Sequence, residues 1–146
     1  MIDQQPNWAV HFTEDQPSGN HIINEYAENS VTINNVQYQC SLYVSPTELI
    51  KELPIQSHQD LNRESLQFIL DLKPELVILG TGNKLEFPHP SIMGLFAEHG
   101  IGFEAMTHAS ACRTYTVLSA ERRNVGMILL IKSNWLVIRV RDCLID

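Results

Sequence analysis

The sequence predicts an α/β fold, a single domain whose core combines parallel strands and helices and whose N-terminal part adds an antiparallel β elaboration. Over residues 36–44, apolar residues recur at every second position, the period of a sheet with one wet face. After residue 45, short apolar runs alternate with helical segments in the order β-α-β-α-β, which is typical of parallel strands joined by crossovers. The length of 146 residues fits one hydrophobic core.

The N-terminal part predicts one hairpin. The polar stretch 13–20 is expected to be a loop, and 30–33 and 36–44 are expected to be strands on either side of Asn34 and Asn35. Asparagine tolerates positive φ, so a tight turn fits there. In the second strand we expect one face to be buried and the other to be wet. The buried face would carry Val36, Tyr38, Cys40, Leu42 and Val44, and the wet face Gln37, Gln39, Ser41 and Tyr43.

The next elements begin after residue 60. Leucine and isoleucine at helical spacing predict a helix over 61–72, which Pro74 ends because proline cannot continue the hydrogen-bonded ladder. The apolar run 76–79 is typical of a strand buried on both faces. A second helix is expected to open at Pro88 or His89, with proline in its first turn, and to run through residue 97.

The last predicted elements form a strand, a helix and a strand. Residues 101–106 predict a strand, Thr107 is a good N-cap for a helix over 108–121, and 125–131 is another apolar strand. If the strands are parallel neighbours, the loop after 76–79 and the start of this helix open on the same edge of the sheet.

The charge is distributed unevenly along the chain. The formal net charge is −7, and residues 1–60 hold eight acids against one base, Lys51, while residues 61–146 hold nine of each. A basic nucleic-acid footprint is excluded over the N-terminal part, so we expect no nucleic-acid partner. The antiparallel layer is expected to form a separate acidic face that is available to a basic partner.

The lack of a recognisable targeting signal and the spacing of the cysteines predict a cytoplasmic location. The first residues carry neither a basic segment nor an apolar one, and the longest apolar runs are far shorter than the roughly 20 residues of a spanning helix, so we expect no membrane insertion. The three cysteines, Cys40, Cys112 and Cys143, lack CxxC spacing, so we expect buried thiols and no disulfide framework or zinc ribbon.

The first candidate binding element is the loop Gly80-Thr81-Gly82 after the buried strand. Ligands of open α/β sheets collect at the carboxyl ends of strands, and glycine lets a ligand approach the backbone closely. The loop matches neither GxGxxG nor GxxxxGK[ST], so neither a dinucleotide nor ATP is expected. The structural alternative is a tight turn whose glycines take positive φ.

The second candidate is the start of the helix at Thr107. Free amide groups, the hydroxyls of Thr107 and Ser110 and the charge of Arg113 would suit a carboxylate or phosphate. The alternative is that the hydroxyls cap the helix while Arg113 pairs with a surface acid. Together the two elements predict an anion pocket formed by Gly80, Thr81, Gly82, Thr107, Ser110 and Arg113.

Histidine and cysteine offer weaker candidates. His108 and Cys112 are spaced i, i+4, but nothing fixes a third ligand and HExxH is absent, so we expect no metal and no cofactor. A helix N-terminus would lower the pKa of the Cys112 thiol, whereas a small residue at this point is more often core. Ser110 does not lie in a GxSxG elbow, so we assign no catalytic residue. Whether the protein is an enzyme stays open, and the absence of a complete catalytic motif favours a non-enzyme.

Several ordered motifs carry a family resemblance. They are Leu76-Val77-Ile78-Leu79-Gly80-Thr81-Gly82, then Gly100-Ile101 leading into Glu104-Ala105-Met106, then Ala111-Cys112-Arg113-Thr114-Tyr115 with Leu118 and Glu121-Arg122. In this order they resemble the small α/β family of the mitochondrial respiratory complex I assembly factor 3 and the adipogenesis-associated domain protein, which also includes bacterial proteins of unknown function. The chain is identified as a bacterial member of this family. The resemblance sets a core of about 22–131, with extensions 1–20 and 132–146 on a single domain of 1–146.

The resemblance implies an α/β fold, a three-layer single domain with a mixed central sheet, flanking helices and an antiparallel β elaboration from the N-terminal part. It implies no established enzymatic activity. It favours a non-catalytic protein-interaction or assembly-factor-like module with an unidentified protein partner. The alternative is a small-molecule anion-binding protein or enzyme that uses the anion pocket. The sequence departs from the family at Thr116, where relatives commonly carry Asn, and in a longer tail, 134–146, which is expected to form an extra strand or cover a sheet edge. The oligomeric state is open.

Overall fold

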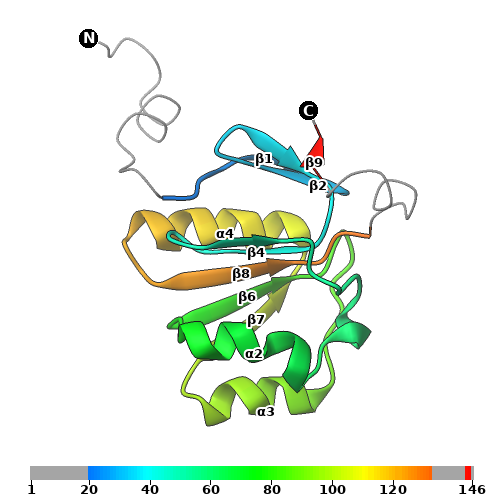
Figure 1. The fold of residues 1–146 in the computed structure, drawn as a ribbon, viewed down its shortest axis with the longest axis vertical. Helices are drawn as coiled ribbons and strands as arrows, with labels where there is room; N and C mark the ends of the chain where they lie inside the picture. The colour runs from blue at the N-terminus through cyan, green and yellow to red at the C-terminus, as the bar shows by residue number, and fades with distance from the viewer. Residues whose placement is uncertain (1–19, 133–143, 146) are drawn as a thin grey trace.

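The computed structural model describes residues 20–132 and 144–145. Within them the chain forms two β-sheets, three α-helices and one short 3-10 helix (Figure 1). In chain order the elements are β1 (Ile23–Ala27), β2 (Ser30–Ile33), β3 (Val36–Tyr38), β4 (Leu42–Val44), β5 (Leu49–Lys51), η1 (His58–Asp60), α2 (Arg63–Leu72), β6 (Leu76–Gly80), α3 (Pro90–Glu98), β7 (Gly102–Met106), α4 (His108–Ala120), β8 (Val125–Leu129) and β9 (Leu144–Ile145).

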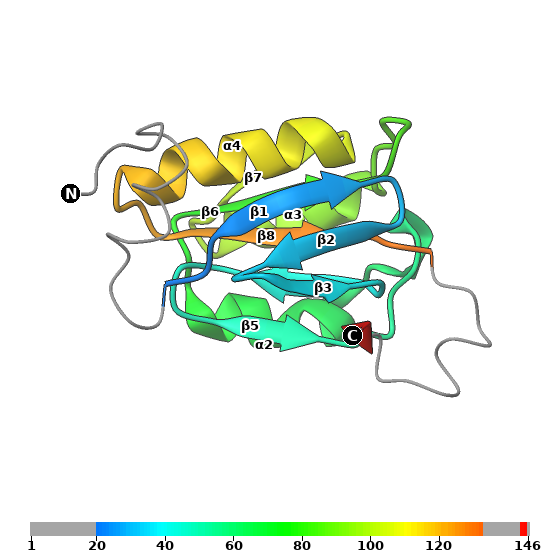
Figure 2. The same cartoon turned by 90° about the horizontal axis from the view of Figure 1, so that it is seen from above.

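The elements are arranged in three layers, which confirms the predicted fold class. The central sheet has the strand order β5-β4-β8-β6-β7, with β6 parallel to β7 and β8 and with β4 antiparallel to β8 and β5. Helices α2 and α3 cover one face of this sheet, and α4 lies on the other (Figure 1). Beside α4 sits the antiparallel sheet β1-β2-β3-β9, as the second view shows (Figure 2).

The predicted hairpin is confirmed, but the prediction that 36–44 forms one continuous strand is wrong. Asn34 and Asn35 take φ values of 51° and 71°, so both occupy the left-handed region that the tight turn needs. The strand that follows is divided: β3 ends at Tyr38, and β4 starts at Leu42 in the other sheet. Because β4 is covered on both faces, alternation stops there. Tyr43, predicted on the wet face, is only 1% exposed.

The predicted helices are confirmed, with small shifts at their ends. Helix α2 begins at Arg63, because Asn62 accepts a hydrogen bond from the Ser65 amide and Ser65 Oγ accepts one from the Asn62 amide in return. Its C-cap, Lys73, is left-handed, directly before Pro74. Helix α3 carries Pro90 in its first turn.

Three strands lie outside the sequence-based prediction or at its margin, as does the 3-10 helix η1. Strands β1 and β5 were not predicted, and β1 is exposed over most of its length. Strand β9 pairs with β3 through Leu144 opposite Tyr38, which is the extra strand expected of the tail. The remaining tail residues, 133–143, and most of the predicted loop 13–20 lie outside the described residues.

The core is divided between the two faces of the central sheet. One cluster packs α2 and α3 against the sheet and includes Tyr43, Phe96 and Ile128. The other packs α4 and the antiparallel sheet against it and includes Ile33, Tyr115 and Met127. Gly126 of β8 lies against the ring of Tyr43, where a Cβ would stand 2.6 Å from two ring carbons. The absence of a side chain at Gly126 therefore makes room for this ring.

Candidate functional site

The loop after β6 and the start of α4 meet at the carboxyl edge of the sheet, as the sequence predicts. Strands β6 and β7 are parallel neighbours, and the helices that follow them lie on opposite faces of the sheet (Figure 1). This is the switch point at which ligands of open α/β sheets bind. Here the two segments are joined by main-chain hydrogen bonds: the His108 amide donates to the Gly82 carbonyl (2.7 Å), and the Thr81 amide donates to the Met106 carbonyl (2.9 Å).

The residues of the loop support its own conformation. At Gly80 a Cβ would stand 2.7 Å from Leu129 Cδ2 and 3.2 Å from Ala111 Cβ, so this glycine lets α4 approach the sheet. Thr81 Oγ1 lies 2.8 Å from the Lys84 carbonyl and accepts a hydrogen bond from the Glu86 amide (3.1 Å). Gly82 takes a φ of 104°, a left-handed conformation that favours glycine.

The residues at the start of α4 are engaged with one another and with β1. Thr107 Oγ1 accepts a hydrogen bond from the Ser110 amide (3.3 Å), so Thr107 is the N-cap. Arg113 is exposed, and its guanidinium donates to the Tyr26 hydroxyl (3.2 Å) and to Ser110 Oγ (3.5 Å). Arg113 therefore connects α4 to the antiparallel sheet. The alternative reading of the sequence paired Arg113 with a surface acid, but its partner in the structure is a tyrosine.

A polar hollow lies on another side of the same loop. We call it the loop hollow: it has a volume of about 230 Å³ and is bounded by Glu28–Asn29 of the β1–β2 turn, by residues 56–58, by the loop 81–86 and by the chain after β8. Thr81 and Gly82 line it, whereas Thr107, Ser110 and Arg113 are not among its lining residues. The two predicted binding elements are thus in contact, but of these two only the loop lines the hollow.

Sequence reasoning missed the charged residues of the loop hollow. Lys84 and Lys132 line it, as do Glu28 and the pair formed by His58 and Glu86, whose Nδ1 and Oε1 atoms are 3.4 Å apart. These side chains come from separate segments of the chain, and none belongs to a recognisable motif. Only the position of Lys84 and Glu86 behind a strand-end glycine loop could have drawn attention to them.

The histidine and cysteine of α4 are buried. His108 is 1% exposed, and neither ring nitrogen has a hydrogen-bond partner among the described residues. Burial lowers the pKa of His108 and raises the pKa of the Cys112 thiol to about 12. A thiol with this pKa is protonated at neutral pH and is a poor nucleophile. Across the described residues, no three side chains of His, Cys, Asp or Glu are grouped so that they could hold a metal ion.

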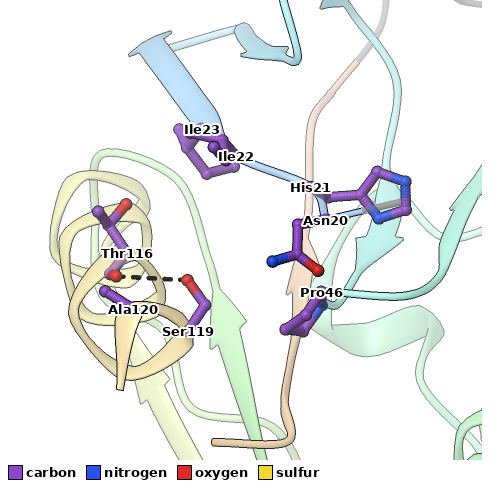
Figure 3. Close-up of a pocket in the computed structure, with 8 residues that line it drawn as sticks. All are labelled: Asn20, His21, Ile22, Ile23, Pro46, Thr116, Ser119 and Ala120. Atoms are coloured by element: carbon purple, nitrogen blue, oxygen red, sulfur yellow. Dashed lines mark hydrogen bonds between the residues drawn. The ribbon is translucent and has the colours of Figure 1, made fainter. Parts of the chain in front are cut away.

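A second, smaller cavity lies between the start of β1 and the far half of α4 (Figure 3). Its volume is about 30 Å³, which is room for a water molecule. Thr116, the departure from the family pattern, lines it, but the Thr116 hydroxyl donates to the Cys112 carbonyl (2.8 Å) within the helix. The Tyr115 hydroxyl donates to the His21 carbonyl nearby (2.9 Å). The bond from Tyr115 joins the chain before β1 to α4 beside this cavity.

The three-layer arrangement and the joined loops define the class of the protein: a small α/β domain with an added antiparallel sheet. The chain belongs to the family described as "Protein of unknown function (DUF498/DUF598)", which matches residues 23–130. This membership confirms the resemblance that the motifs between residues 76 and 122 indicate.

Named relatives come from bacteria and animals. The chain is 31% identical over 107 residues to the "13 kDa major membrane protein" of Francisella tularensis subsp. holarctica, covering 73% of this chain and 87% of the relative. It is 33% identical over 112 residues to "NADH dehydrogenase [ubiquinone] 1 alpha subcomplex assembly factor 3" of Mus musculus, covering 74% of this chain. That match spans 59% of the mouse protein.

A solved structure has the same fold. The NMR structure of Xanthomonas campestris protein XCC1710 aligns with a TM-score of 0.73 at 29% identity, covering 90% of this chain and 92% of that one. The fold described above is therefore shared with a bacterial protein of solved structure. Within the described residues, no helix has both the length and the apolar character of a membrane-spanning segment.

Proposed function

We propose that this protein is a non-catalytic, assembly-factor-like module that works by binding another protein. The observation that carries the proposal is the similarity to the complex I assembly factor 3 of the mouse, at 33% identity over 74% of this chain. The chemistry of the described residues agrees with it, because the buried Cys112 thiol and His108 ring are poorly suited to nucleophilic or general-base catalysis. We further propose a bacterial, cytoplasmic protein with one domain over residues 1–146.

The partner is expected to be basic. Among residues 20–60 the acids are Glu25, Glu28, Glu48, Glu52 and Asp60, and the only base is Lys51. All five acids are exposed, and Glu25 and Glu28 stand on β1 and its turn, at the outer strand of the antiparallel sheet. An exposed acidic surface speeds association with a basic protein and makes the affinity sensitive to salt.

Neutralising the acidic surface should weaken partner binding. Pull-down with the full chain is expected to recover a stoichiometric partner, and the variant E25Q/E28Q should bind it about fivefold more weakly, because exposed charge pairs each contribute up to about 1 kcal/mol. Raising the salt concentration from 50 to about 500 mM should weaken the wild type more than the variant. If the affinity for the partner changes neither with salt nor with these substitutions, the acidic surface is not the binding surface. If the purified protein turns over a metabolite and the pull-down recovers no partner, the proposed function is wrong.

A second candidate function is binding of a small anion at the start of α4. The observation that favours it is the hydrogen bond from the His108 amide to the Gly82 carbonyl, which joins the loop after β6 to the start of α4. The residues proposed for this site are Gly80, Thr81, Gly82, Thr107, Ser110 and Arg113. The exposed Arg113 guanidinium would supply the positive charge.

The variant R113A tests the second candidate. In a thermal-shift screen of phosphorylated and carboxylated metabolites, a ligand held by this site should raise the melting temperature of the wild type and have little effect on R113A. If every stabilising ligand acts equally on both proteins, Arg113 only fastens α4 to Tyr26, and the second candidate fails.

A further inference from the structure

We infer that the free edge of strand β7 is the docking site for an extended segment of the partner protein. That segment would add to the central sheet as an antiparallel strand, with a basic residue opposite Glu104. The inference rests on the proposed protein-binding function and gives it a surface other than the acidic face of β1. Three features of β7 carry it: an edge without the usual protection, main-chain groups that point outward, and a central carboxylate without an ion pair.

Strand β7 differs from the other strands that end the two sheets. Exposed edges are usually covered by another element, shortened, bulged, or guarded by lysine or proline. Strand β1 contacts α4 and has a bulge between Ile23 and Glu25. Strand β5 has three residues and ends at Lys51, after which Glu52 takes a φ of 62°. Strand β7, by contrast, has five residues in unbroken register with β6, and none of them is proline or lysine.

The main-chain groups of this edge form a regular outward row. The Gly102 amide donates to the Glu75 carbonyl (3.0 Å) on the side of β6. Because the direction of the main-chain groups alternates along a strand, those of Phe103 and Ala105 point away from β6. Among the described residues, no strand lies on that side of β7, and no turn or loop hydrogen bond reaches these two residues. An extended segment is the ligand that pairs with such a row.

The side chains of β7 define which residues the added strand should carry. Glu104 is exposed at the middle of the strand and takes part in none of the ion pairs among the described residues. On the opposite face, the half-buried Phe103 ring stacks on the buried Phe96 ring, with 4.9 Å between the centroids, and Ala105 is also half-buried. A residue opposite Glu104 should therefore be basic, and its two neighbours should be apolar.

Charge favours a basic partner over a second copy of this chain. Self-pairing centred on β7 would set the Glu104 carboxylates of two copies opposite each other, and like charges in directly opposite positions are destabilising. The net charge of −7 adds to the repulsion between copies and attracts a basic segment. The same carboxylate thus protects the edge from self-association and selects the partner.

The test is a titration of the full-length ¹⁵N-labelled protein with a blocked peptide of sequence Thr-Thr-Val-Lys-Val-Thr-Thr. Saturable shifts and slower hydrogen exchange are expected at the amide signals of Phe103 and Ala105. A peptide N-methylated at both valines should not bind, because the N–H groups of these residues would donate to β7. A peptide N-methylated at the lysine should still bind, because that N–H would point away from β7.

Two variants test the edge from the side of the protein. The variant A105P removes an outward N–H group, which an edge strand tolerates, and should abolish peptide binding while leaving the fold intact. The variant E104K should bind the lysine peptide about fivefold more weakly and should prefer a peptide with glutamate in place of lysine. The matched control is E64K, which makes the same charge change at an exposed position of α2 and should leave the affinity unchanged.

Several outcomes would overturn the inference. Absence of saturable shifts at Phe103 and Ala105, or equal binding of the two N-methylated peptides, would show that the edge does not pair with a strand. Equal weakening by E104K and E64K would mean that the peptide responds only to the overall charge. A dimer of the protein alone, with the same two amides protected, would make the occupant a second copy. If a partner recovered by pull-down binds A105P as tightly as the wild type, the edge is not its docking site, although the proposed function stands.

Discussion

Replacing Gly126 with alanine is expected to lower the free energy of unfolding by about 3 kcal/mol, the upper part of the usual range for overpacking a core. The new Cβ would stand 2.6 Å from two carbons of the Tyr43 ring. That ring cannot swing away, because Tyr43 is 1% exposed and packs edge-on against Phe68, with 5.7 Å between the ring centroids. Urea denaturation of wild type and G126A measures the difference.

Two further variants separate this clash from a general effect of replacing glycine. The variant G94A adds a Cβ on α3 where nothing lies within 4 Å, so it should raise stability by up to about 1 kcal/mol through helix propensity. In a Tyr43→Leu background, adding G126A should cost much less than it does in the wild type, because the ring is gone. If G126A is as stable as G94A, the tight contact between β8 and Tyr43 is not a feature of the folded protein.

The helices could be predicted from the sequence because their ends are set locally. Asn62, His89 and Thr107 each accept a hydrogen bond from an amide in the first turn that they cap, so start signals close in sequence were sufficient. The division of 36–44 could not be predicted in this way. Whether Leu42 continues the hairpin or enters the central sheet depends on its pairing with Leu129, which lies far away in the chain.

The candidate site could be predicted from the sequence only in part, for the same reason. The meeting of the Gly82 loop with α4 follows from the β-α-β-α-β order, and the sequence predicted it. The loop hollow joins Glu28, His58, Lys84 and Lys132 from four segments, and no local spacing relates them. The role of Gly80 was also not apparent, because it depends on how closely Ala111 of α4 packs against the sheet.

Acidification is expected to destabilise the protein through His108. Burial holds its pKa below the ordinary value of 6.5, with the nearby Ser30 backbone acting more weakly in the opposite direction. The unfolded chain therefore takes up a proton at a higher pH than the folded protein does. The free energy of unfolding should be unaffected by His108 well above pH 6.5. It should decrease as the pH drops through 6.5 toward the pKa of His108 in the folded state. Each unit between the two pKa values corresponds to about 1.4 kcal/mol.

Apart from the Ser30 backbone, the described surroundings of His108 offer its protonated form little stabilisation. The ring lies at the positive end of the α4 dipole, 6.2 Å from the ring of Tyr26, and Arg113 binds the hydroxyl of that same tyrosine. Cys112, one turn along, stays a neutral thiol because burial raises its pKa. An imidazolium at position 108 would thus lie at a helix N-terminus, and no carboxylate among the described hydrogen-bond and ring contacts offsets it.

The variant H108L separates the contribution of this histidine from those of the other histidines, which are present in both proteins. Urea denaturation at pH 8, 7, 6 and 5 should show the difference in unfolding free energy between H108L and wild type growing in favour of H108L below pH 7. At pH 8 the leucine should match or exceed the wild type, because it removes two buried nitrogens without hydrogen-bond partners among the described residues. A constant difference across the four pH values would mean that His108 keeps an ordinary pKa in the folded protein, and acid stability would then be set elsewhere.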